Sequence, residues 1–251
     1  MGKIPKSHPR YKSLITREKI SKEFKNGIVH ETGLIAHGRG EAFDYLIGEK
    51  TIPSSMRAAK VAAALFLLAK NPVISINGNV AALSAKECIE LAKTIPAKIE
   101  VNLFHRTKAR VEKIVAMLSK LGAIGIYGVK PDAVIPFIEH DRALCDKNGI
   151  YSADVVLVPL EDGDRCEALK KMGKTVITID LNPLSRTAKT ADVTIVDNIT
   201  RAIPNIRKWV VNFKKNHVSE EELQNIVDSW DNKKNLKEVL SFISKRINSL
   251  F

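Results

Sequence analysis

Residues 154–180 read DVVLVPLEDGDRCEALKKMGKTVITID, and this stretch decides the fold. It begins and ends with short runs rich in β-branched residues, 155–158 and 175–179, which is the composition of buried strands. A helical stretch, residues 164–172, separates the two runs. Strand, helix and strand in this order predict two parallel strands joined by a crossover helix.

The same alternation extends along the chain in both directions. Strand-like runs occur at 73–76, 99–104, 124–127 and 193–196, and helical stretches at 83–94 and 109–121. Ser84-x-x-Glu87 predicts a capping box at the start of the first of these helices. Because strands alternate with helices, we expect an α/β fold with a Rossmann-like, mostly parallel sheet and helices on both faces.

The N-terminal segment is predicted to be helical. Thr16 is placed to cap a first helix that ends near Asn26-Gly27, and a second helix is expected over 40–48. Pro53 marks the first turn of a third, 54–70, whose alanines and leucines lie nearly all round it and predict burial.

The C-terminal segment also has a helical pattern. Ser219-x-x-Glu222 predicts a capped helix, and a last helix is expected over 233–251. The 251 residues contain no repeat and no Ser/Gly/Pro-rich linker, so we expect a single Rossmann-like domain. Its expected parts are an N-terminal helical segment 1–70, an α/β core 71–200 and C-terminal helices 201–251.

Composition excludes several classes of protein. Hydrophobic residues make up 45% and charged residues 27%, and 13 Gly and 10 Pro are too few for a disordered or collagen-like chain. The longest apolar run, 61–69, is short of the ~20 residues of a membrane span, and no secretory h-region follows the first lysines. Cys88, Cys145 and Cys166 form no C-x-x-C pair, so neither disulfides nor a metal site is indicated. We expect a cytoplasmic protein with no membrane partner.

The net charge of +12 favours anionic ligands: nucleic acid, a nucleotide or a phosphorylated metabolite. Residues 1–30 contribute eight basic side chains against two acidic ones. However, only 12 of the 40 basic residues are Arg, and a lysine-rich surface is also typical of a solvated, solubilising face. The total charge alone leaves both interpretations open.

Ligands of open parallel sheets bind outside the carboxyl ends of the strands, so the residues that follow each strand are candidates. Asn77-Gly78-Asn79 follows the 73–76 run, and its glycine permits close backbone approach to a ligand. His105-Arg106-Thr107 follows the 99–104 run and could surround a phosphate or carboxylate. The alternatives are an ordinary loop at the first position and, at the second, a threonine cap beside two exposed basic residues.

The third strand end carries the most candidates. Asp180 and Asn182 follow the 175–179 run and could hydrogen-bond a ribose or a base edge, Arg186 could hold phosphate, and Asn198 lies after the neighbouring strand. Neither a G-x-x-x-x-G-K-[ST] loop nor a G-x-G-x-x-G fingerprint is present. A nucleotide would therefore have to be held in another way.

Near the N-terminus, Gly38-Arg39-Gly40 leaves a guanidinium with little steric cover. Arg17 belongs to a basic stretch that follows the compact sequence Ser7-His8-Pro9-Arg10-Tyr11. A lone His37 is more typical of a surface or capping residue than of a catalyst. The six histidines form no metal-ligand pattern, so no metal ligands are assigned.

These residues resemble a known family, the archaeal phosphopantothenate synthetases, also called 4-phosphopantoate–beta-alanine ligases. The resemblance runs from the N-terminus to about residue 210, and its most specific string is 33–46. It rests on 4–11 (IPKSHPRY), 16–19 (TREK), 33–46 (GLIAHGRGEAFDYL), 77–79 (NGN), 104–107 (FHRT) and 180–187 (DLNPLSRT).

The resemblance implies a Rossmann-like homodimer that condenses 4-phosphopantoate with beta-alanine on the route to coenzyme A. ATP would activate the carboxylate as an acyl adenylate, so that AMP and diphosphate are released, with Mg²⁺ on the phosphates. The ATP contacts that the resemblance implies are Arg17, Arg39, Asp180, Leu181, Asn182, Arg186, Thr187, Asn198 and Ile199.

The remaining site residues are hypotheses. We assign the phosphate of phosphopantoate to His105, Arg106 and Thr107, with Asn77 and Asn79 also binding substrate. Arg39, His105 and Arg106 are the expected catalytic cations, because negative charge builds up at the reacting phosphorus.

Two other function classes are weighed. A nucleic-acid-binding protein would use the basic N-terminal segment, but Tyr11 and Phe24 are its only Phe, Tyr or Trp residues for base stacking. A nicotinamide-dependent oxidoreductase would use the same sheet, but the glycine fingerprint is missing. We therefore expect small-molecule substrates and no nucleic-acid partner.

Overall fold

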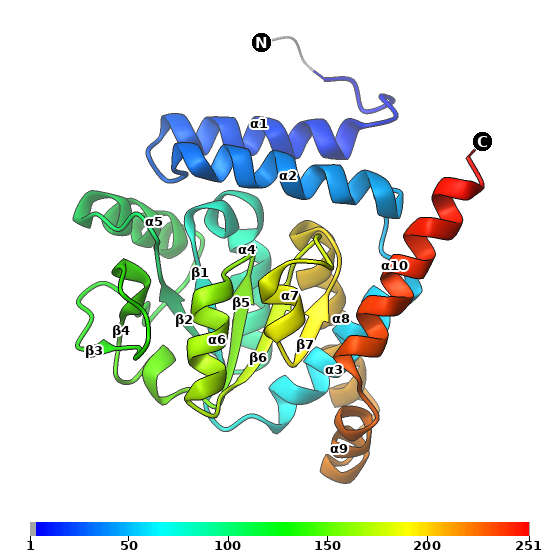
Figure 1. The fold of residues 1–251 in the computed structure, drawn as a ribbon. Coiled ribbons are helices and arrows are strands. Elements are labelled where there is room, and N and C mark those ends of the chain that lie inside the picture. Colours follow the sequence, from blue (N-terminus) through cyan, green and yellow to red (C-terminus); the bar gives the residue numbers. More distant parts are fainter. Residues whose placement is uncertain (1–3, 251) are drawn as a thin grey trace.

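A five-stranded parallel sheet lies between two layers of helices in the computed structural model, which describes residues 4–250 (Figure 1). Lys3 of the basic N-terminal segment and Phe251 lie outside the described residues. The strand order is β2-β1-β5-β6-β7, so the expected Rossmann-like α/β class is confirmed. The strands are β1 (Val73–Ile76), β2 (Lys98–Val101), β5 (Val155–Pro159), β6 (Thr175–Ile179) and β7 (Val193–Ile195).

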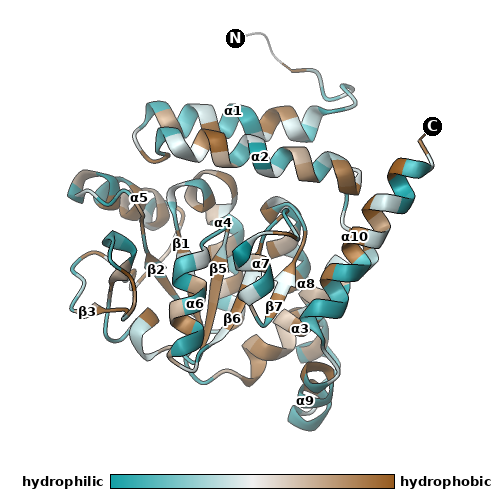
Figure 2. Ribbon diagram, viewed as in Figure 1, coloured by the Kyte–Doolittle hydropathy of each residue, from teal (hydrophilic) through white to brown (hydrophobic). Residues whose placement is uncertain are grey.

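Alternate residues of each strand face opposite layers of the core. In β5, Val155 and Leu157 pack into the larger hydrophobic cluster, whereas Val156 and Val158 pack into a second cluster on the other face. Both faces are therefore buried, and Figure 2 shows the resulting hydrophobic colouring of the central strands. The helices of the larger cluster include α3 (Pro53–Leu68), α4 (Gly78–Thr94), α5 (Lys108–Lys120) and α8 (Ile199–Lys215), and the second cluster includes α6 (Gly163–Lys171).

The first two helices, α1 (Tyr11–Lys25) and α2 (Glu31–Ile47), lie side by side across the carboxyl end of the sheet (Figure 1). The prediction that Thr16 caps the first helix is wrong, because Thr16 lies inside α1 and its hydroxyl donates to the carbonyl of Ser13 at 2.7 Å. The second helix begins at Glu31 rather than near Gly40. His30 caps it by accepting a hydrogen bond from the Thr32 amide.

The C-terminal helices are α9 (Glu220–Asp228) and α10 (Asn232–Asn248), which follow α8 and the short α7 (Arg186–Thr190) in the chain. The predicted capping box of α9 is confirmed, with both hydrogen bonds between Ser219 and Glu222 present. Helix α10 packs against α2, α7 and β7 through a third apolar cluster that contains Leu236, Val239 and Ile243.

Two local predictions are corrected. Residues 124–127 form no strand: only Tyr127 makes a bridge, to Glu100, because Gly125 and Gly128 turn the backbone through positive φ of 63° and 86°. The capping box at Ser84 does not form. Instead α4 begins at Gly78, capped by the Asn77 side chain, and Ser84 is a non-helical kink inside it.

The segment between α5 and β5 contains short elements that were not expected. They are an antiparallel pair, β3 (Ala133–Val134) and β4 (Leu144–Cys145), and single 3₁₀ turns at Asp141–Ala143 and Ile150–Ser152. No helix among residues 4–250 is long and apolar enough to cross a lipid bilayer.

Candidate functional site

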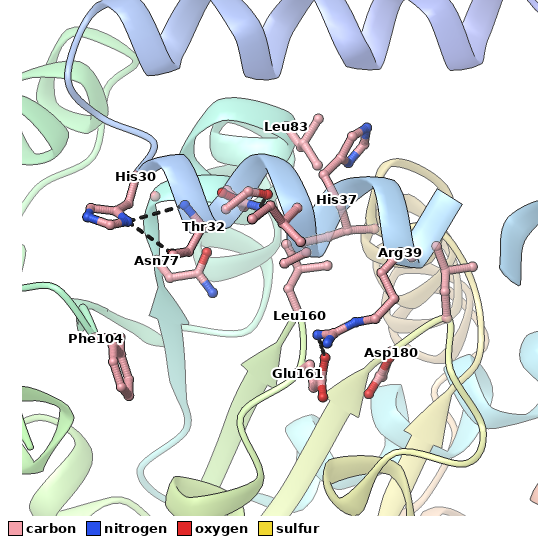
Figure 3. Close-up of a pocket in the computed structure, with 18 of the residues that line it drawn as sticks. His30, Thr32, His37, Arg39, Asn77, Leu83, Phe104, Leu160, Glu161 and Asp180 are labelled. Carbon is pink, nitrogen blue, oxygen red and sulfur yellow. Dashed lines mark hydrogen bonds and ion pairs between the residues drawn. The ribbon is translucent and has the colours of Figure 1, made fainter. Parts of the chain in front are cut away.

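The candidate site is a cavity of about 530 Å³ at the carboxyl ends of β1, β5 and β6, with α2 lying over it (Figure 3). In the sheet, β2 lies on one side of β1, whereas β5, β6 and β7 lie in this order on the other side. The cavity therefore lies at the topological switch point, where open α/β sheets bind ligands. The candidate residues in its wall are Arg39, Asn77, Asn79, His105, Asp180, Leu181, Asn182, Asn198 and Ile199.

Asp180 is buried in the cavity wall directly after β6. Its carboxylate accepts hydrogen bonds from the Asn182 amide at 2.9 Å and from the Ser185 hydroxyl. Burial raises the pKa of Asp180 to about 6, although these hydrogen bonds act in the opposite direction. The loop is thus pre-shaped by its own hydrogen bonds, which hold Asn182 and Leu181 at the cavity.

Asn198 holds the start of α8 at the same end of the cavity. Its side-chain oxygen accepts from the Thr200 amide at 3.1 Å, and its side-chain amide donates to Asp44 of α2 at 3.1 Å. The cap therefore ties α8 to α2 while Ile199 forms part of the wall.

Arg39 reaches down from α2 to Glu161, with which it forms an ion pair in the middle of the cavity (Figure 3). Both side chains are partly exposed, 55% for Arg39 and 39% for Glu161, so an anionic ligand can replace the glutamate as partner of the arginine. Gly33 allows α2 to approach Asn79 closely, because a Cβ at this position would collide with the Asn79 side chain.

His37 lies on the same helix but points away from the strand ends in Figure 3. Its Nε2 is buried and has no hydrogen-bond partner among the described residues. Burial lowers its pKa, which favours the neutral ring at pH 7.

Arg17 does not line the cavity. It lies on α1 and forms a bidentate contact with Glu41 of α2, with Nε 2.9 Å from both carboxylate oxygens. Glu41 lines the cavity, so Arg17 contacts the cavity wall from outside and fixes the position of the Glu41 side chain.

Arg186 and Thr187 also stand outside the wall. Arg186 forms ion pairs with Asp164, in the first turn of α6, and at 3.4 Å with Glu167, in the middle of the same helix. The buried hydroxyl of Thr187 accepts from the backbone amide of Asp162 at 2.8 Å, which fixes the turn between β5 and α6.

The other end of the cavity contains stacked imidazoles. The rings of His30 and His105 lie 3.8 Å apart, centroid to centroid, and 19° from parallel. Burial, His105 and the nearby Arg110 all lower the pKa of His30. Phe104 borders the pair and contacts both His105 and His140.

Arg106 and Thr107 follow His105 but do not line the cavity. Thr107 caps α5 by accepting from the Arg110 amide at 3.2 Å, and Arg106 donates to the carbonyl of Gly128 at 2.6 Å. The structure thus brings only His105 of this triplet to the cavity.

Several wall residues were missed by the sequence reasoning. Leu160 and Glu161 directly follow β5 and could have been found by inspecting that strand end like the others. Both have positive φ, 65° and 38°, a strained backbone of the kind that gathers at functional sites. His30, Arg110 and Arg142 also line the cavity. Within residues 4–250 no cluster of three or more His, Cys, Asp or Glu side chains could hold a metal ion.

Residues 54–246 match the family described as phosphopantothenate/pantothenate synthetase. The chain is 57% identical over all its 251 residues to a 4-phosphopantoate–beta-alanine ligase of Thermococcus kodakarensis, 95% of whose length is covered. A ligase of the same name from Methanosarcina mazei is 54% identical over 250 residues and 98% of its own length. These matches cover most or all of the sequence, and we conclude that the chain belongs to the phosphopantothenate/pantothenate synthetase family.

Proposed function

We propose that this chain is an AMP-forming ligase that condenses 4-phosphopantoate with beta-alanine at the expense of ATP, in the synthesis of coenzyme A. The observation that carries the proposal is the 57% identity, over the whole chain, to a relative named for this reaction. The cavity supports it, since cationic side chains at both of its ends, among them Arg39 and Arg110, face one shared space.

We assign ATP to the end of the cavity formed by the loop after β6 and the start of α8. Asp180, Asn182 and Asn198 offer polar groups there for the ribose and base, and Arg39 faces the middle of the cavity. Arg17 would act through Glu41, while Arg186 and Thr187 would shape the neighbouring turn.

In the proposed reaction a carboxylate oxygen of phosphopantoate attacks the α-phosphorus of ATP, and diphosphate leaves. The amine of beta-alanine then attacks the acyl carbon, AMP leaves, and the amine loses a proton. Arg39 would pair with the phosphate oxygens, where negative charge increases in the first step.

Magnesium would enter with ATP. Glu161 and Asp180 are carboxylates in the cavity wall, close enough that Glu161 contributes to the raised pKa of Asp180. One or two carboxylates together with substrate phosphates are the usual ligands of Mg²⁺, so these residues fit the ion. Bound there, Mg²⁺ would neutralise charge on the triphosphate.

The proposal includes a homodimer in the cytoplasm. The dimer is tested by light scattering, where the expected mass is twice the 27.8 kDa of one chain.

The activity is tested by omission. Purified protein should convert ATP to AMP only when phosphopantoate and beta-alanine are both present, because a captured acyl group is needed for turnover. Unphosphorylated pantoate should be a poor substrate, since it leaves the cationic groups of the cavity unpaired. Robust turnover with pantoate would refute the substrate assignment.

A further inference from the structure

The cavity has two ends of different character. In Figure 3, Arg39 and Asp180 lie on one side, His30 and Phe104 on the other, and Leu160 stands between them. The proposed ATP site occupies the first end. The second end is left for another ligand.

Within the described range 4–250, Arg110 is a cation without a counterion at this second end. Its guanidinium donates to two neutral carbonyl oxygens, those of His105 and, at 2.9 Å, of Ile28. Its Nε is buried without a hydrogen-bond partner, and among residues 4–250 no carboxylate forms an ion pair with it. An uncompensated charge in a desolvated position is costly, and here burial lowers the pKa of the side chain.

Arg142 adds a second unmatched charge. It pairs with Asp162, but the same carboxylate also lies 2.7 Å from Arg165, which is only 1% exposed and donates to Ser75 at 2.7 Å. Two guanidinium groups therefore share one carboxylate. The Nε of Arg142 is buried and unpartnered among the described residues, and its side chain is 11% exposed in the cavity wall.

The two guanidinium groups lie in one part of the cavity, since burial together with the nearby Arg110 lowers the pKa of Arg142. Arg142 also lies 6.0 Å from the ring centroid of Phe104, which contacts His105.

Two cations that share so little negative charge are suited to a dianion. A phosphoryl group carries about two negative charges and accepts several hydrogen bonds, whereas the carboxylate of beta-alanine carries one charge. Arg106, the neighbouring candidate, is not in the cavity wall, because its guanidinium is turned to the carbonyls of Gly128 and Val129.

We propose that Arg110 and Arg142 bind the phosphoryl group of the phosphorylated acid and so determine the preference of the enzyme for phosphopantoate over pantoate. This inference rests on the proposed function and adds the residues that recognise the phosphate. The acid would then lie with its phosphate toward β1 and its carboxylate toward Arg39 and the ATP phosphates.

Calorimetry in the presence of a non-hydrolysable ATP analogue tests the proposal. The titrants are phosphopantoate and pantoate, and the variants are Arg110→Gln, Arg142→Gln and Arg106→Gln. Arg207→Gln is the control, since it removes one positive charge from a surface ion pair with Glu90. Should Arg142→Gln fail to fold, Arg142→Lys keeps the charge beside Asp162 and removes the planar fork.

The wild type should bind phosphopantoate far more tightly than pantoate. Arg110→Gln and Arg142→Gln should each weaken phosphopantoate binding by about one to two orders of magnitude, while affinities for pantoate and the ATP analogue change less than about threefold. Arg207→Gln should match the wild type.

Three results would overturn the proposal. If both variants bind phosphopantoate as the wild type does, the phosphate lies elsewhere although the proposed function stands. If only Arg106→Gln removes the preference, the phosphate site lies outside this cavity wall, near the carbonyls of Gly128 and Val129. If the variants bind phosphopantoate as the wild type does but raise KM for beta-alanine in steady-state kinetics, this end binds the amino acid. A wild type that binds no phosphopantoate would instead refute the proposed function.

Discussion

Replacing Arg39 with glutamine should separate a ligand contact from a structural ion pair. The Arg39–Glu161 pair is 55% and 39% exposed, so its loss should lower the free energy of unfolding by at most ~1 kcal/mol. If Arg39 instead pairs with a phosphate during the reaction, a charge-assisted contact of ~1.5–3 kcal/mol is lost, which is about a 10- to 150-fold fall in kcat/KM for ATP.

The chain supplies a matched control in Arg57→Gln. Arg57 of α3 pairs with Glu238 of α10, and the exposed fractions, 55% and 40%, nearly equal those of the Arg39 pair. Denaturant unfolding and steady-state kinetics of both variants are compared. Both should unfold like the wild type, and only Arg39→Gln should lose activity. Equal kinetics for the two variants, or a loss of stability confined to Arg39→Gln, would refute the role of Arg39 as a phosphate contact.

Three further predictions concern stability. Gly33→Ala should lower the melting temperature in thermal unfolding, because its Cβ would collide with Asn79. Gly38→Ala, whose Cβ would meet nothing within 4 Å, should raise the free energy of unfolding by ~0.5–1 kcal/mol in denaturant titrations. Thr187→Val should cost ~1–3 kcal/mol in denaturant unfolding, because a buried backbone amide loses its acceptor. Burial raises the pKa of Asp180 to about 6 in the folded protein, whereas the pKa of an unfolded aspartate is ~4. The free energy of unfolding should therefore fall as the pH rises from about 4 to about 6, because the folded state binds the proton more tightly. In denaturant titrations over that range, Asp180→Asn should show a smaller fall.

Most of the fold follows from local pattern. The β-branched runs at 155–158 and 175–179 form strands because their alternate side chains are buried on both faces of the sheet. The start of α2 was missed because Gly33, Gly38 and Gly40 are poor helix formers, and tertiary packing over the strand ends outweighs that propensity. The run at 124–127 is apolar like a strand, but its glycines bend it away from the sheet after a single bridge.

The candidate site was predictable where the strand-end rule applies. That rule places Asn77, His105 and Asp180 at one edge of the sheet, and the structure has them in one cavity wall. Arg110 and Arg142 could not be found in this way, because one lies inside a helix and the other in a 3₁₀ turn whose path depends on packing of the 133–145 segment. Their ligand binding, like that of the other candidates, stays a prediction.

The fate of an oxygen isotope tests the central claim of an acyl-adenylate ligase most directly. The protein is incubated with ATP, beta-alanine and phosphopantoate labelled with ¹⁸O in its carboxylate. The products are then separated, and their masses are measured by mass spectrometry. The oxygen that bridges carboxyl carbon and α-phosphorus stays with AMP when the amine attacks, so one label per turnover should appear in AMP, with diphosphate as the other product. Label in inorganic phosphate, with ADP as the nucleotide product, would contradict the proposed mechanism even if the two substrates are correct.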